Sequence, residues 1–202
     1  MIKNIVVKTL VSGALLAGAF GQSAIAAEVA GIKFADTAKV GGKELQLNGL
    51  GVRTKFIVKV YAAGLYLQDK KSTAEEVFAA EGPRRMQLVI MRDISSEDFG
   101  NAFMSGINNN LDGKDKTKIV TQISKFGEIF AAVDGLKKGD VLDTDYIPGQ
   151  GTICILNGKR LGEVTPEVNF NNAVLKIWLG NKPADNALKL KLLAPAAASA
   201  KK

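Results

Sequence analysis

An arginine and a tyrosine eight residues apart are the side chains in this sequence best suited to bind a ligand. Arg53 follows a turn containing Gly49 and Gly51, and Tyr61 lies in the apolar run that begins at Phe56. A guanidinium and a phenol can neutralise and orient one carboxylate through charge-assisted hydrogen bonds. A buried arginine needs an acceptor, because an unpaired buried charge is costly. Arg53 is therefore exposed, paired with an acidic residue of another element, or available to a bound anion.

The segment that positions this pair is residues 47–67, in which β-branched and aromatic residues dominate. This composition predicts a strand, or a bent pair of strands. Apolar residues occupy both alternating faces, so we expect both faces to be covered and the strand to be central in its sheet. Gly64 within the run indicates a bulge or a close approach of another group.

Several chemistries are excluded or weakened by composition. The chain has no histidine, which removes the usual serine and cysteine triads and most zinc and copper sites. Asp140, Asp143 and Asp145 lie close together but lack the glycine and distal glutamate of a calcium loop. Cys154 is the only cysteine, and its place in the run GTICIL predicts a buried, unreactive thiol. We therefore expect no cofactor and no metal.

The first 26 residues have the pattern of a cleaved secretory signal peptide. Lys3 and Lys8 precede an apolar segment over residues 10–20, and small residues end the segment at Ala24 and Ala26. An N-terminal anchor helix is the weaker alternative, because the apolar segment is short for a membrane span. No later run suits stable membrane insertion. The pattern predicts a periplasmic protein with one domain over residues 27–193 and a flexible tail over residues 194–202.

The formal charge of +7 comes from scattered lysines without a basic stripe of interleaved aromatics. Such a distribution gives little support to nucleic-acid binding. The sequence does not predict an oligomeric state.

The first half of the mature chain alternates strand and helix patterns. Residues 29–34 and 43–47 read as a hairpin around Gly41 and Gly42. Ser72 with Glu75 predicts a capping box for a helix over residues 72–80, and a strand follows at residues 85–92. Ser95 or Ser96 caps the next helix, and a further helix is predicted over residues 114–133. The apolar stripe of the helix that starts after Ser95 or Ser96 consists of Phe99, Phe103, Ile107 and Leu111.

The second half predicts three short strands over residues 141–147, 152–156 and 159–164, with an Asn-Gly turn before the last. Asn169 or Asn171 opens a helix that Gly180 ends, and a short helix follows over residues 184–193. The whole pattern predicts an α+β fold in which helices pack on an antiparallel sheet.

The strings GVRTKFIVKVYAAGLYL, MRDIS, YIPGQGT and FNNAVLKIWLG, in this order, resemble the chalcone-isomerase-like proteins, most closely their bacterial secreted branch. The resemblance covers residues 29–193. It implies an open-faced β-sandwich, with a ligand cleft between a long sheet and a layer of helices. Enzymes of the family place an arginine, a strand threonine, a helix tyrosine and asparagine, and a late hydroxyl residue around the substrate. Here these positions correspond to Arg53, Tyr61, Phe99, Gly106 and Ile177.

The loss of most of these polar groups argues against chalcone isomerisation. The fatty-acid-binding relatives keep an arginine and a tyrosine that hold the carboxylate, and Arg53 and Tyr61 match that pair. The resemblance thus implies a small amphiphilic ligand such as a fatty acid. The candidate binding residues are Arg53, Tyr61, Phe99, Phe103, Ile107, Ile177 and Trp178.

Three functions remain open at this point. The first is a periplasmic, non-catalytic protein that binds a fatty acid or a small amphiphilic acid. The second is an isomerase, an intramolecular lyase of chalcone-isomerase type, in which Arg53 activates an enone substrate. The third is a structural or partner-binding protein with a filled cleft.

Overall fold

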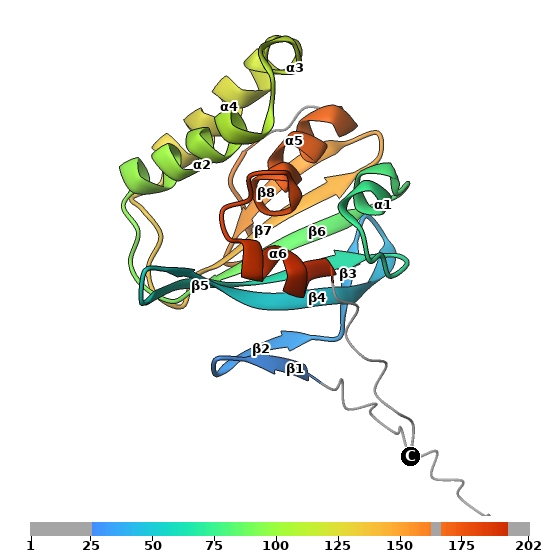
Figure 1. Ribbon diagram of the computed structural model, residues 1–202, viewed down its shortest axis with the longest axis vertical. Coiled ribbons are helices and arrows are strands. Elements are labelled where there is room, and N and C mark those ends of the chain that lie inside the picture. The colour runs from blue at the N-terminus through green and yellow to red at the C-terminus, as the bar shows by residue number, and fades with distance from the viewer. Residues whose placement is uncertain (1–25, 163–166, 194–202) are drawn as a thin grey trace, which may run out of the picture.

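A curled antiparallel sheet of seven strands carries helices on one face, as the computed structural model shows (Figure 1). The structure describes residues 26–162 and 167–193. The predicted signal peptide and the C-terminal tail lie outside these residues, apart from Ala26. The strand order is β3-β4-β5-β6-β7-β8-β9, so every strand pairs with its neighbour in sequence. The predicted α+β class with helices on an antiparallel sheet is confirmed. The bounds of the sheet strands are β3 (Thr37–Val40), β4 (Lys43–Lys55), β5 (Val58–Leu67), β6 (Arg84–Ile90), β7 (Val141–Ile147), β8 (Gly151–Leu156) and β9 (Lys159–Arg160).

The helices form two layers above the sheet. The helices α5 (Val168–Leu179) and α6 (Asn186–Leu193) contact the strands directly, and α2 (Ser96–Asn110) packs on α5. The helix α4 (Val120–Ala131) packs in turn on α2, where Phe103 stacks on Phe126 with ring centroids 4.5 Å apart. The two shorter helices are α1 (Ala74–Ala79) and α3 (Gly113–Lys118). Within the described residues, no helix has the length and apolar content needed to cross a bilayer.

The opposite face of the sheet is partly covered by a separate hairpin of β1 (Ala26–Val29) and β2 (Ile32–Ala35). Phe34 is fully buried there, and a Cβ on Gly64 would lie 2.8 Å from its ring. The close approach predicted at Gly64 is therefore present, without a bulge. Tyr66 donates a hydrogen bond to the carbonyl of Ala35 at 3.0 Å, which fixes this hairpin to β5.

The hairpin predicted from residues 29–34 and 43–47 around Gly41 and Gly42 was partly wrong. The two glycines join β3 to β4, and both have positive φ, as a tight turn requires. The stretch 29–34 is instead split by its own turn at Ala30 and Gly31 into the ends of β1 and β2.

Residues 47–67 form two antiparallel strands, which is the bent-pair alternative. β4 and β5 meet at a turn made by Phe56 and Ile57, with Lys55 paired to Val58. β5 is buried on both faces from Val60 to its end, as expected for a central strand. Arg53 and Tyr61 therefore lie on neighbouring strands, where they are direct partners.

Glycines in β4 allow α6 to approach the sheet closely. A Cβ on Gly49 would lie 2.3 Å from the carbonyl oxygen of Lys191, and one on Gly51 would lie 2.9 Å from a side-chain carbon of Leu188. The fully buried Asn48 sits at the adjacent register shift and donates to the carbonyl of Leu192 at 2.7 Å. The glycine-rich turn predicted here is thus part of strand β4, on which α6 packs.

Helix boundaries differ from the sequence reading in four places. The capping box of α1 is formed by Thr73 and Glu76, one residue later than predicted. The helix predicted over residues 114–133 is two helices, because the chain leaves helical geometry at Ile119. α5 begins at Val168, so neither predicted asparagine opens it, and α6 begins at Asn186. Ser95 caps α2 as predicted.

The bounds of β7 and β8 agree closely with those predicted from the turn residues around them. β7 has the predicted bounds, and β8 begins one residue earlier, at Gly151. β9 covers only residues 159–160 of the strand predicted to reach residue 164, and residues 163–166 lie outside the described part. Cys154 is fully buried on β8, and burial raises the pKa of its thiol.

Candidate functional site

Arg53 and Tyr61 face each other across the β4–β5 ladder. They are direct partners in the register, and side chains of such partners point to the same face of a sheet. The guanidinium carbon of Arg53 lies 5.6 Å from the centroid of the Tyr61 ring. A register shift follows at Arg53 and Thr54, which bends the end of the hairpin.

The Tyr61 hydroxyl is held in one orientation by a tryptophan from α5. Trp178 Nε1 donates a buried hydrogen bond of 2.7 Å to the Tyr61 oxygen. Indole N–H is only a donor, so the tyrosine oxygen accepts this bond and its own proton can be donated to another group. Burial raises the pKa of Tyr61, although the charge of Arg53 and the Trp178 bond act in the opposite direction. The phenol therefore stays protonated at neutral pH.

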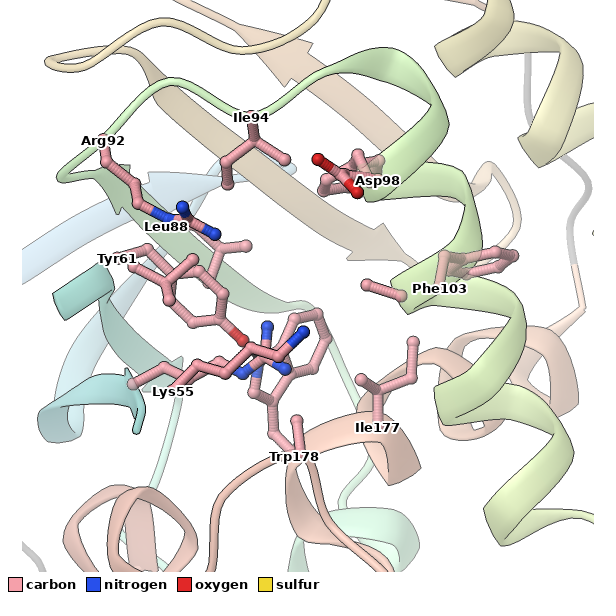
Figure 2. Close-up of a pocket in the computed structure, with 14 residues that line it drawn as sticks. Lys55, Tyr61, Leu88, Arg92, Ile94, Asp98, Phe103, Ile177 and Trp178 are labelled. Carbon is pink, nitrogen blue, oxygen red and sulfur yellow. Dashed lines mark hydrogen bonds between the residues drawn. The ribbon is translucent and has the colours of Figure 1, made fainter. Parts of the chain in front are cut away.

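A cavity of about 120 Å³ opens beside this pair (Figure 2). Its apolar walls come from β5, β6, α2 and α5. Lys55, Tyr61 and Arg92 lie on one side of the cavity, and Asp98 faces them from α2. Arg53 also lines the cavity. With three basic residues and one acidic residue in its lining, the cavity favours an anion. The apolar wall residues include Val60, Leu88, Phe99, Phe103, Ile177 and Trp178.

A second recess of about 290 Å³ adjoins the cavity and shares Arg53, Lys55 and Asp98 with it. Its remaining lining is more polar and includes Asn101 and Asn109 of α2. Arg53 thus stands between an apolar interior and a polar outer recess, which suits the head of an amphiphile.

Six of the seven residues proposed from the sequence line the cavity, and Ile107 does not. Ile107 is fully buried in the core, one turn beyond Phe103. The physical reason is the close contact of α2 with α5: a Cβ on Gly106 would lie 2.8 Å from Ile177. This contact closes the space before it reaches Ile107.

Sequence reasoning missed three polar lining residues: Lys55, Arg92 and Asp98. Lys55 was read as part of a buried strand, although it is exposed next to the hairpin turn. Arg92 follows β6, and Asp98 lies in the first turn of α2, where an acidic residue is ordinary. No signal in the sequence distinguished them from other surface charges.

Two other arginines of the sheet have guanidinium groups that donate hydrogen bonds to protein oxygens. Arg84 is 2% exposed and donates to Asn171 at 2.6 Å, to Asn172 at 2.7 Å and to the carbonyl of Val77 at 2.8 Å. Its burial lowers its pKa to about 10. This contact assigns a structural role to the asparagine pair of the string FNNAVLKIWLG.

Arg85, on the opposite face, forms a two-bond ion pair with Asp145 at 2.6 and 2.7 Å and lies 3.4 Å from Asp143. Arg53 differs from both. Its Nε is buried without a hydrogen-bond acceptor, and within residues 26–162 and 167–193 no carboxylate lies at ion-pair distance from it.

Comparison with models of protein families identifies the family of this chain. The model of the family described as chalcone isomerase-like matches residues 26–194. The chain belongs to this family.

Among solved structures, a fatty-acid binding protein of Arabidopsis thaliana is similar, with a TM-score of 0.67 and 17% sequence identity. The similarity covers 84% of this chain and 96% of that protein, and at this identity it establishes the fold. No curated protein matches the chain.

Proposed function

We propose that this protein binds a small amphiphilic carboxylate, such as a medium-chain fatty acid, without transforming it. The observation that carries the proposal is the half-buried Arg53 at the polar side of an apolar cavity, with no carboxylate of the described residues at ion-pair distance. A partly buried charge without a counter-charge is costly, so a bound carboxylate would stabilise this arginine. Arg84 and Arg85 do not need one, because protein oxygens already bind them.

The site can hold a carboxylate with two kinds of donor. The Arg53 guanidinium supplies charge and direction, and the Tyr61 hydroxyl supplies a neutral hydrogen bond. Because Trp178 occupies the acceptor side of that hydroxyl, its proton remains available for the ligand. Trp178 therefore acts as a wall and as a positioning residue.

The size of the cavity limits the apolar part of the ligand. A cavity of 150 Å³ accommodates benzene, and the space here is about 120 Å³. The inner cavity therefore suits about six carbon atoms, fewer than a long-chain fatty acid has. The polar recess outside Arg53 leaves room for the ligand's head and its hydration.

The fold neighbour supports the proposed class of ligand, and the N-terminal sequence supports a periplasmic location. The fold neighbour described as a fatty-acid binding protein makes a carboxylate lipid the natural first ligand to test. We also propose that the protein acts in the periplasm after loss of residues 1–26, on the strength of the basic, apolar and small-residue order of that segment.

The test is a calorimetric titration of delipidated protein with straight-chain acids from butyrate to palmitate. Each buried methylene contributes about 0.8 kcal/mol, so affinity should rise about fourfold per carbon and level off near octanoate. Octanol, which keeps the chain and lacks the charge, should bind at least about tenfold more weakly than octanoate. Equal binding of octanol and octanoate, or no binding of any acid, would contradict the proposal. Turnover of a chalcone by the same preparation would favour the isomerase.

A further inference from the structure

The turn between β4 and β5 exposes the most accessible large apolar side chains of the described residues. Phe56 is 92% exposed and Ile57 is 93% exposed, and Val58 beside them is 44% exposed. Figure 1 shows this hairpin reaching the edge of the molecule, away from α1 and α5. Single exposed apolar residues are common on proteins, but three in succession at a projecting tip form a contact surface.

Folding alone does not account for the residues at this tip. Phe56 has a φ of 57°, in the left-handed region that turns normally fill with glycine, asparagine or aspartate. A bulky residue there is strained, and its exposed ring contributes nothing to the core. Glycine in place of Phe56 would make a more stable turn, so the apolar pair points to a contact outside the protein.

Basic residues surround the tip. Lys55 and Lys59 flank the turn on the two strands and are exposed. Arg92 lies beside them, since the Met91 amide donates to the carbonyl of Val60 at 3.0 Å. In the described part of the chain, no carboxylate lies at ion-pair distance from any of these three cations. An apolar tip among unpaired cations matches the chemistry of the interface of an anionic bilayer, with acyl chains beneath negative headgroups.

The same hairpin forms one wall of the ligand cavity. Lys55 of β4 and Val60 and Tyr61 of β5 line the cavity, and Arg92 lines it from the end of β6. Phe56 and Ile57 do not line it. A surface bound by Phe56 and Ile57 would therefore lie next to the polar side of the cavity, where the head of an amphiphile would enter.

We propose that the Phe56–Ile57 tip docks this protein on an anionic lipid surface. The apolar pair enters the headgroup region, and Lys55, Lys59 and Arg92 contact the phosphates. This is peripheral docking, and it does not depend on the proposed carboxylate ligand. Exchange of that ligand with the membrane would follow only if both proposals hold.

The experiment is sedimentation with vesicles of phosphatidylcholine alone or mixed with equal parts of phosphatidylglycerol. Wild type should bind the mixed vesicles, and added salt should weaken the binding. The double variant Phe56→Gly/Ile57→Asn should bind at least about tenfold more weakly. Glycine is favoured at the first turn position, where Phe56 has its positive φ, so this variant should fold as well as wild type or better. Lys59→Glu should weaken binding about fivefold or more.

Two matched controls should bind as wild type does. Leu190→Ser removes another exposed apolar residue, 71% exposed on α6, and Lys43→Glu reverses an exposed charge at the opposite end of β4. The double variant should titrate with octanoate as wild type does, because neither residue lines the cavity.

Failure of wild type to bind the mixed vesicles, or equal binding by wild type and the double variant, would overturn the docking proposal. A tip-dependent crosslink to a protein in the absence of vesicle binding would overturn it too. Absence of octanoate binding with intact vesicle binding would instead refute the proposed ligand.

Discussion

Replacing Arg53 with methionine should abolish most ligand binding and leave the protein at least as stable. Methionine keeps an unbranched chain but removes the charge and the donors. A hydrogen bond to a charged group contributes about 1.5–3 kcal/mol, so octanoate affinity should fall about 10- to 150-fold. The exposed Arg160, replaced in the same way, should have no effect on binding. Isothermal titration of the two variants measures both results.

The stability of the same variant separates a ligand-binding arginine from a structural one. Removal of a buried Nε without an acceptor relieves about 1–3 kcal/mol, against about 0.5–1 kcal/mol lost from the contact with the Tyr61 ring. The melting temperature should therefore stay the same or rise by about 2–4 °C for each kcal/mol gained. Arg85→Met should instead cost about 3–5 kcal/mol, because it leaves Asp145 buried and unpaired. Unchanged octanoate affinity in Arg53→Met, or a loss of stability like that of Arg85→Met, would refute the reasoning.

Further predictions concern packing and titration. Gly49→Ala should destabilise the fold by about 2 kcal/mol or more, because its Cβ would meet the backbone of α6. Gly100→Ala, which adds a Cβ in open space within α2, should stabilise the fold by about 0.5–1 kcal/mol. Urea unfolding measures the free energy of unfolding of both variants. Burial raises the pKa of Tyr61 and Tyr66, so the native state keeps protons that the unfolded chain releases near pH 10, and stability should hold below that pH and fall above it. Ultraviolet titration that ionises both phenols at pH ~10 in the native protein would contradict this. Cys154, fully buried, should react with a bulky disulfide reagent only after unfolding, and rapid native labelling would disprove its burial.

The sheet could be predicted where turns carry their usual residues. The Asn157-Gly158 pair and the Pro148-Gly149 pair marked the ends of β8, and its neighbours were then placed by alternation. The β4–β5 turn was not located, because Phe56 and Ile57 are apolar and carry no turn signal. Residues exposed for a contact outside the protein were thus mistaken for part of a buried strand.

The candidate site was predictable in its polar pair but not in its limits. Arg53 and Tyr61 could be chosen from residue type and from the family resemblance, although their placement on facing strands depended on the missed turn. The Trp178 bond to Tyr61 joins residues 117 positions apart, and no local pattern reports such a contact. The exclusion of Ile107 depends in the same way on how closely α2 approaches α5 at Gly106.

The most direct test of the central claim is a crystal structure of the protein with octanoate. We predict one carboxylate oxygen within hydrogen-bond distance of the Arg53 guanidinium, the Tyr61 hydroxyl donating to the carboxylate, and the chain between Phe103 and Ile177. A carboxylate bound only to Lys55 or Arg92 with its chain outside the cavity, or an acid-free cavity at saturating octanoate, would contradict the account.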